Sequence, residues 1–157
     1  MNDFNHFDKE GNAIMVDVSG KVRTSRVAKA KGSIEMSSNT IKKILEGGIR
    51  KGDVLSIAQL AGIMGAKKTS ELIPLCHPLG LSSIEVKLFC VRERNTVDIF
   101  ATCKVEGKTG VEMEALTAVS VAALTVYDMC KAFDKGMCIK DICLIYKSGG
   151  KSGTFKA

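Results

Sequence analysis

The 157-residue sequence has no tryptophan, two tyrosines and only two prolines. It has 45% hydrophobic and 25% charged residues and no low-complexity block, which excludes a disordered, collagen-like or linker-type chain. The length suits one ordinary domain with one core. The few aromatic residues form no exposed series along the predicted strands, which disfavours a module that stacks nucleic-acid bases.

The sequence also lacks a secretory leader and a long uncharged run. The N-terminus carries Asp3, Asp8 and Glu10 and has no basic start followed by an apolar core. The longest stretch without a charge, residues 115–127, falls short of the roughly 18 residues that a bilayer span needs. We therefore expect a cytoplasmic protein with no membrane contact.

Cysteines are present, but no C-x-x-C pair is. Without an export route we expect reduced thiols. Cys76 and His77 are adjacent, which is poor chelating geometry, and nothing else completes a zinc set, so we predict no metal site. The six cysteines are Cys76, Cys90, Cys103, Cys130, Cys138 and Cys143.

Lysine and arginine outnumber aspartate and glutamate by 23 to 17, which favours an anionic partner. Two GK[ST] matches, at residues 107–109 and 150–152, lack the earlier glycine of a nucleotide-binding P-loop, because Thr102 and Ile145 stand there. The first match lies between a predicted strand and a helix start, where its amides and Lys108 could meet an anion. The second fits either a mobile basic tail or a glycine-rich flap that closes on phosphate.

Apolar periodicity and turn residues predict an α+β fold in one domain, ferredoxin-like, with a largely antiparallel sheet and helices packed on one face. We expect a flexible N-terminal segment over 1–20, an α+β domain over 21–146 and a basic, glycine-rich C-terminal flap over 147–157. The expected elements are a strand at 32–36, a helix at 40–46 capped by Ser38 or Asn39, a helix at 54–66 capped by Asp53, an irregular loop at 73–78, strands at 84–90 and 97–105, a long helix at 111–133 and a strand at 138–146.

The long helix carries charges on an otherwise apolar surface. Asp128 and Lys131 are i, i+3 neighbours, which suits an acid–base pair or a surface salt bridge. Glu114 lies about 21 Å from Asp128 along the helix axis, so the two cannot share a site within one chain.

A stripe of small or β-branched residues separates these charges, namely Ala118, Val121 and Thr125. If the helix crosses its own copy antiparallel near Val121, Glu114 comes beside the partner's Asp128 and Lys131. We therefore predict a composite site in a homodimer.

The prolines of Pro74–Pro78 fix the direction of His77, which suits a base, a hydrogen-bond donor or a ligand, or a purely structural role. Lysines occur at predicted loops and helix ends, where each one alone suits a solvated surface and several together suit a polyanion site.

Several blocks, MVDVS at 15–19, KGDV at 51–54, AGIMGAKKT at 61–69, LIPLCHPL at 72–79, residues 107–131 and KSGGKSG at 147–153, together resemble the cyclic pyranopterin monophosphate synthase family of molybdenum-cofactor biosynthesis. The resemblance runs from about residue 10 to 156. It implies conversion of 3',8-cyclo-7,8-dihydroguanosine 5'-triphosphate into cyclic pyranopterin monophosphate with release of pyrophosphate, a phosphorus–oxygen lyase reaction. It also implies a ferredoxin-like fold and a homohexamer of three dimers, with sites between subunits.

The resemblance assigns the catalytic positions to Asp128, Lys131, Lys51 and His77. It assigns substrate contacts to Leu75, Cys76, His77, Glu112, Met113, Glu114, Lys67, Lys147 and Arg26. It implies a small nucleotide-derived substrate, no nucleic-acid or membrane partner, and no resident metal or redox cofactor, while Mg²⁺ accompanying the triphosphate stays open.

The residue chemistry suits this reaction. Ring opening and pterin closure need proton transfers, for which Asp128, Lys131 and His77 are suitable groups. Expulsion of pyrophosphate needs cations, and we assign phosphate binding to Lys51 and Lys67 and closure over the triphosphate to the 147–153 segment. A GTP cyclohydrolase-like or phosphate-ester hydrolase is the enzymatic alternative, and a basic nucleic-acid-binding module is the alternative of another class.

Overall fold

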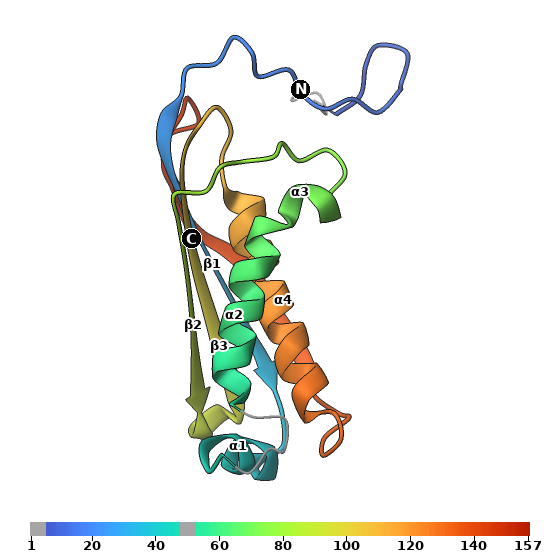
Figure 1. Ribbon diagram of the computed structural model, residues 1–157, viewed down its shortest axis with the longest axis vertical. Helices are drawn as coiled ribbons and strands as arrows, with labels where there is room; N and C mark the ends of the chain where they lie inside the picture. The colour runs from blue at the N-terminus through green and yellow to red at the C-terminus, as the bar shows by residue number, and fades with distance from the viewer. Residues whose placement is uncertain (1–5, 48–52) are drawn as a thin grey trace.

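The computed structural model describes residues 6–47 and 53–157 and has a five-stranded antiparallel sheet in the order β2-β3-β1-β4-β5. Helices α2 and α4 lie side by side over one face of the sheet (Figure 1). This confirms the predicted α+β, ferredoxin-like arrangement. In chain order the elements are β1 (Thr24–Glu35), α1 (Ser38–Leu45), α2 (Val54–Lys67), α3 (Thr69–Leu72), β2 (Ser83–Val91), the 3₁₀ turn Arg92–Arg94, β3 (Thr96–Gly107), α4 (Glu112–Cys130), β4 (Cys138–Ser148) and β5 (Phe155–Lys156).

Strand β1 is much longer than the predicted strand at 32–36. The part that the prediction missed, residues 24–31, ends in alternating alanine and lysine. Ala28 and Ala30 are fully buried, while Lys29 and Lys31 are exposed. This half-buried pattern has the strand period of two, but alanine is a weak signal for a strand. The pairing of β1 with both β3 and β4 makes it the central strand.

The C-terminal segment also differs from the prediction. Residues 147–153 were expected to lack regular structure, yet Lys147 and Ser148 continue β4 because they pair with Ala28 and Val27 of β1. The chain then turns and returns as β5 alongside β4 (Figure 1). The C-terminal flap is therefore attached at both ends to the sheet.

Smaller differences lie at the helix ends. The side chain of Ser37, and not Ser38 or Asn39, caps α1 by accepting a hydrogen bond from the Thr40 amide. Asp53 caps α2 as predicted. Helix α4 ends three residues before the predicted end at residue 133. Residues 48–52, between the expected helices at 40–46 and 54–66, lie outside the described residues.

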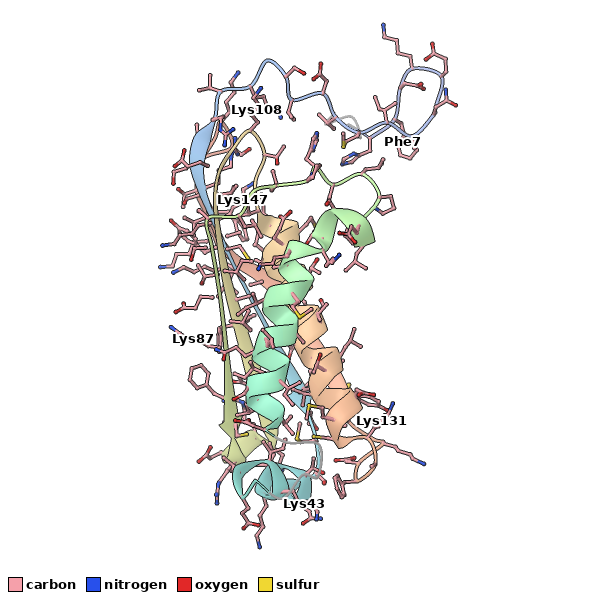
Figure 2. All side chains as sticks on the ribbon, viewed as in Figure 1. Phe7, Lys43, Lys87, Lys108, Lys131 and Lys147 are labelled. Carbon is pink, nitrogen blue, oxygen red and sulfur yellow. The ribbon has the colours of Figure 1, made fainter. Side chains whose placement is uncertain are left out.

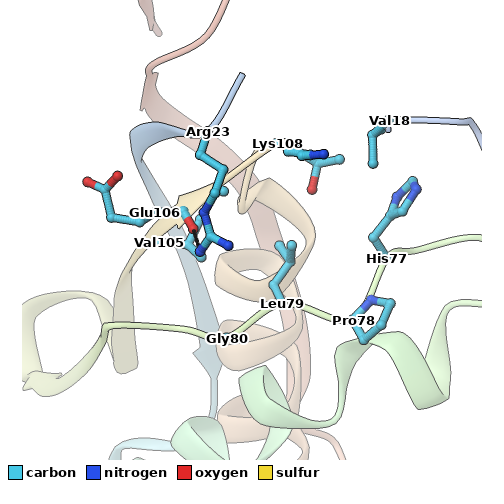
Figure 3. A pocket seen from close by; sticks show the side chains of 11 residues that line it. Val18, Arg23, His77, Pro78, Leu79, Gly80, Val105, Glu106 and Lys108 are labelled. Atoms are coloured by element: carbon cyan, nitrogen blue, oxygen red, sulfur yellow. Dashed lines mark hydrogen bonds between the residues drawn. The ribbon is translucent and has the colours of Figure 1, made fainter. Parts of the chain in front are cut away.

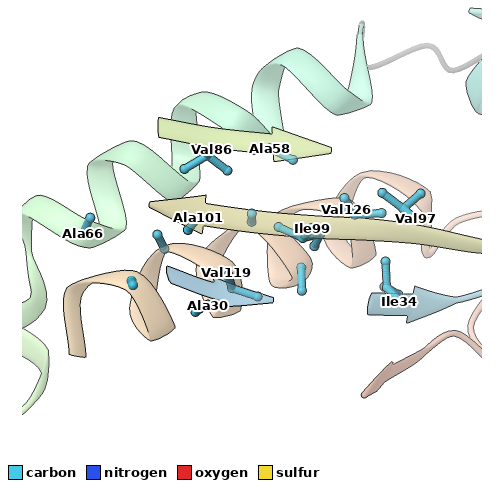
Figure 4. Packing of buried hydrophobic residues seen from close by; sticks show 14 of the residues in the cluster. Ala30, Ile34, Ala58, Ala66, Val86, Val97, Ile99, Ala101, Val119 and Val126 are labelled. Carbon is cyan, nitrogen blue, oxygen red and sulfur yellow. The ribbon is translucent and has the colours of Figure 1, made fainter. Parts of the chain in front are cut away.

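The core lies between the sheet and the α2–α4 layer, where small and β-branched side chains interlock (Figure 4). Glycines let the two helices approach closely: a Cβ at Gly62 would lie 2.9 Å from the Ala118 carbonyl oxygen, and one at Gly65 would lie 2.7 Å from Val121. The stripe of Ala118 and Val121, expected to receive a second copy, therefore packs against α2 of the same chain.

Helix α4 alone among the described residues is long and apolar enough to cross a membrane by length and composition. Most of its apolar window, 56%, is buried inside the protein against the sheet and α2, and a core helix passes the same test. The length and composition of α4 are therefore those of a core helix that runs along the sheet.

We expect Gly62→Ala to lower the free energy of unfolding by about 1–3 kcal/mol, because the new methyl group meets a backbone oxygen that cannot rotate away. The stability lost through this clash should exceed the gain of about 1 kcal/mol that alanine gives over glycine inside a helix. Urea unfolding measures it. Gly80→Ala, where nothing lies within 4 Å, is the control, and equal unfolding free energies for both variants would contradict the close packing.

Candidate active site

The loop between α3 and β2 positions His77 beside the N-terminal segment. The Nε2 atom of His77 lies 2.7 Å from the carbonyl oxygen of Val16. Because a carbonyl oxygen only accepts, Nε2 carries a proton, and in the neutral ring Nδ1 is left as an acceptor. The loop thus offers an oriented imidazole that can take up a proton at Nδ1.

A pocket of about 270 Å³ forms between this loop, the first turn of α4 and the N-terminal segment. It brings together residues that the sequence placed far apart. Val16, Val18, Lys21 and His6 complete its wall. The predicted residues that line it are Leu75, Cys76, His77, Glu112, Met113 and Glu114.

Glu114 is the carboxylate nearest the core, and its residue surface is only 4% exposed. Burial raises the pKa of Glu114, and the negative charge of Glu112 raises it further. A hydrogen bond from the Glu114 backbone amide lowers this pKa in part. Two carboxylates in the first turn are compatible with the positive end of the α4 dipole. Glu114 therefore holds its proton to a higher pH than an ordinary glutamate does.

The thiols beside Glu114 are held in the protonated form. Burial and the charge of Glu114 raise the pKa of Cys76, and the same two causes raise the pKa of Cys103 to about 12. A thiol is a poor nucleophile compared with a thiolate. Cys76 therefore offers the pocket a small, weakly polar surface and no covalent chemistry.

Arg26, Glu112 and Lys147 meet on the other side of this first turn. Lys147, on β4, forms an ion pair with Glu112, and the two side chains are about one quarter exposed. Arg26, on β1, donates from Nε and Nη2 to the carbonyl oxygens of Gly107 and Lys108 at 3.0 and 3.1 Å. Arg26 thereby holds the loop between β3 and α4 in place.

A further pocket of about 310 Å³ is also lined by His77 (Figure 3). It shares His77, Val18, Leu79 and Thr109 with the 270 Å³ pocket. Arg23 there donates from Nη2 to the carbonyl oxygen of Glu106 at 2.8 Å. Pro78 and Leu79 continue the wall from the His77 loop. His77 thus lines two adjoining pockets.

Asp128 and Lys131 lie at the other end of α4, far from Lys108 and Lys147 (Figure 2). The ammonium group of Lys131 is 2.7 Å from Oδ1 of Asp128, and both side chains are more than half exposed. The hydrogen bond and charge of Asp128 raise the pKa of Lys131, so this lysine stays protonated. The pair lines a pocket of about 420 Å³ with Tyr127, Ala132 and Lys135.

The structure therefore brings most predicted residues together around the first turn of α4 and leaves Asp128 and Lys131 in a separate pocket. Lys67 is exposed at the end of α2 and lines none of these pockets. Lys51 lies outside the described residues. The sequence analysis did not predict Lys21 and His6 as pocket residues, because an irregular N-terminal segment has no periodic signal. The MVDVS block at 15–19, close to Lys21, was the one signal that pointed to this segment.

Within residues 6–47 and 53–157, no group of three or more His, Cys, Asp and Glu side chains could hold a metal ion. The charged groups of the site are instead lysine, arginine, histidine and carboxylate side chains. Such a set suits binding of a phosphorylated small molecule together with proton transfer.

The α+β fold and these two clusters are compatible with an enzyme that handles an anionic small molecule. The MoaC family model matches residues 15–150, and the chain belongs to this family. The chain is 62% identical over 152 residues to cyclic pyranopterin monophosphate synthase of Rhodospirillum rubrum, covering 97% of this chain and 92% of the relative.

Two further relatives bear the same name. The one from Desulfitobacterium hafniense is 59% identical over 96% of this chain and 91% of its own length. The one from Desulforapulum autotrophicum is 55% identical over 100% of this chain and 96% of its own. The family resemblance predicted from the sequence blocks is confirmed.

We expect Glu114→Gln to stabilise the fold at pH 8. Because burial raises the folded-state pKa above that of the unfolded chain, the wild type loses stability as the pH rises through the folded pKa, while glutamine does not titrate. The advantage should fade as the pH falls toward 4.5, the ordinary value. Urea unfolding across this range measures it, with the exposed Glu106→Gln as control; a pH-independent difference would contradict the assignment.

Proposed function

We propose that this chain acts in molybdenum-cofactor biosynthesis, converting 3',8-cyclo-7,8-dihydroguanosine 5'-triphosphate into cyclic pyranopterin monophosphate and pyrophosphate. It is a pyrophosphate-releasing lyase with a small, nucleotide-derived substrate. The observation that carries this conclusion is the identity of 55–62% over almost the whole chain with three relatives that bear the name of that enzyme. The site chemistry agrees, because it combines cations for phosphate with groups that exchange protons.

The working site is shared by two copies of the chain. Glu114 and Asp128 are separated by 14 residues of one continuous helix, about 21 Å along its axis, so one chain presents them at opposite ends. A two-fold axis across the helix layer places the His77 half of one copy beside the Asp128 half of the other. The family resemblance extends this homodimer to a homohexamer of three dimers.

The outer surface of the helix layer supplies the contact for this pairing. Leu60 and Met64 of α2 and Leu124 of α4 are 56–59% exposed there. Apolar side chains this exposed on neighbouring helices favour burial against another surface. The small-residue stripe of α4 does not form the contact between the two copies, because α2 already covers Ala118 and Val121.

In the phosphate step, a substrate hydroxyl attacks the α-phosphorus. One P–O bond forms, the P–O bond to the pyrophosphate breaks, and the hydroxyl proton passes to a base. Asp128 is that base. The Asp128 carboxylate keeps Lys131 protonated, so Lys131 acts as a cation and does not accept the proton. Nδ1 of His77 and the carboxyl of Glu114 serve proton transfers in ring opening and pterin closure.

Cations balance the phosphate charge. Lys51 and Lys67 hold phosphate, while Arg26 and Lys147 keep the β3–α4 loop and Glu112 in position. The 147–153 segment covers the bound triphosphate. The reaction runs in the cytoplasm without a resident metal or redox cofactor, and any Mg²⁺ enters as part of the substrate.

We expect Asp128→Asn and Lys131→Ala each to lower the rate of pyrophosphate release by about 10²- to 10⁴-fold, because each removes a proton-transfer or charge-stabilising group. Stopped assays of pyrophosphate from the cyclised nucleotide measure this, and GTP itself should not be consumed.

Lys87→Ala is the matched control, because Lys87 forms an equally exposed ion pair with Glu85 at 2.9 Å on β2, away from α4. It should retain the wild-type rate. Asp128→Asn with a wild-type rate would overturn the role given to this carboxylate.

A further inference from the structure

A turn of residues 131–137 joins α4 to β4 and carries Lys131, which the proposed function uses together with Asp128. Asp128 belongs to α4, whereas Lys131 follows Cys130, the last residue of the helix. The Lys131 amide still donates to the carbonyl oxygen of Tyr127 at 2.8 Å. Because helix ends fray unless they are held, the geometry of the Asp128–Lys131 pair depends on how firmly this turn is fixed.

One carboxylate ties the turn to the start of α1. Oδ2 of Asp134 accepts a hydrogen bond from the Ser37 amide at 2.8 Å and another from the Thr40 hydroxyl at 3.1 Å. Thr40 is only 1% exposed, so this anchor lies at the edge of the core. The other oxygen, Oδ1, accepts from the Gly136 amide at 3.2 Å, so Asp134 also closes its own turn. Asp134 therefore fixes the path of the chain just beyond Lys131.

A tyrosine holds the same turn from the helix side. The Tyr127 hydroxyl donates to the carbonyl oxygen of Lys135 at 3.0 Å. Tyr127 is half-buried and packs against the core, which fixes the direction of its ring. The ammonium group of Lys43 on α1 lies 5.0 Å from the centroid of the Phe133 ring, a cation–π distance. Lys43 and Lys131 lie at the same end of the molecule, so α1 and α4 hold the turn together (Figure 2).

The ion pair between Asp128 and Lys131 does not fix this geometry by itself. Both side chains are more than half exposed, and exposed ion pairs contribute little to stability. Lysine also has a long, flexible side chain, so the place of its ammonium group depends first on the place of its backbone. None of the α1 residues, 38–45, lines the pockets of His77 or Asp128. Helix α1 therefore acts on the site only through the turn.

We propose that Asp134 and Tyr127 are positioning residues, which hold the backbone of Lys131 so that its ammonium group meets the substrate beside the Asp128 carboxylate. This inference rests on the proposed function. Neither residue transfers a proton, and Asp134 lines none of the pockets of the site. A cation that is already in place needs no reorganisation as charge develops in the transition state. Misplacing such a group by about 1 Å can slow a reaction about 10²-fold.

Steady-state kinetics of the intact oligomer with the cyclised nucleotide test the inference. Asp134→Ala and Tyr127→Phe should each lower kcat about tenfold and change KM by less than about twofold, because a misplaced Lys131 loses stabilisation of the transition state alone. Asp134→Asn should keep most of kcat, since its side-chain oxygen can still accept from the Ser37 amide.

Two control variants remove the same groups elsewhere in the chain. Tyr146→Phe removes the hydroxyl of the other tyrosine, which lies on β4. Asp98→Ala removes a carboxylate on β3 that accepts from the Thr96 hydroxyl at 2.8 Å. Both should keep the wild-type kcat.

Double variants separate positioning from a general loss of folded protein. If Asp134 acts through Lys131, adding Asp134→Ala to Lys131→Ala should slow the reaction no further. Added to His77→Ala, the same change should multiply the loss. A merely destabilising change would slow both backgrounds alike. Multiplied losses in the Lys131→Ala background, or a wild-type kcat in both Asp134→Ala and Tyr127→Phe, would overturn the inference.

Hydrogen exchange separates this inference from the proposed function, because it needs no substrate. The amides of Lys131, Phe133 and Asp134 donate to carbonyl oxygens of the last turn of α4. They should exchange about fivefold faster or more in Asp134→Ala than in wild type. Faster exchange with no turnover by the wild type would contradict the proposed function and support the hold of Asp134 on Lys131. Unchanged exchange with normal turnover would overturn the inference alone.

Discussion

The constraint on which the rest depends is the rigidity of α4. A continuous helix from Glu112 to Cys130 holds its two ends about 27 Å apart, and the chain cannot bring these ends closer without breaking the helix. The packing of α4 into α2 and the sheet removes any freedom to bend, because Gly62 and Gly65 leave no gap between the helices. Under the proposed function, the groups at one end of α4 therefore act together with those at the other end of a second molecule's α4.

The same helix organises the charges. Its first turn carries Glu112 and Glu114. The surrounding loops and strands bring His77 and five basic residues to the same end, namely Lys21, Arg26, Lys108, Lys147 and Lys151. Burial makes Glu114 a group that holds its proton more strongly than usual. Gly149 and Gly150 let the C-terminal flap lie against Ser25 and Arg26. One end of the molecule therefore carries both a buried carboxyl and a group of basic side chains.

Much of the fold followed from the sequence, because local signals dominate in the hairpin β2–β3, in the Asp53 cap and in α4. The N-terminal half of β1 did not, since buried Ala28 and Ala30 lack the branched side chains that indicate a strand. The return of β5 depends on pairing with β4, which no local pattern reveals. Spacing identified Ala118 and Val121 as a contact stripe, but could not tell whether α2 or a partner helix covers it.

Sequence blocks and helix geometry predicted His77, Glu114, Asp128 and Lys131 as site residues, and these roles stay predictions. The predicted separation of Glu114 from Asp128 within one chain is confirmed. The wall formed by Val16 and Lys21 needed the three-dimensional path of the N-terminal segment.

The shared site is tested most directly by mixing two inactive proteins, His77→Ala and Asp128→Asn, under conditions that exchange subunits. Random pairing makes half of the dimers mixed, and each mixed dimer has one site with both lesions and one site with neither, so about one quarter of the wild-type activity should return. Mixing His77→Ala with Glu114→Gln, whose lesions lie in the same half, should return none. Absence of recovery in the first mixture, with subunit exchange demonstrated, would contradict the account.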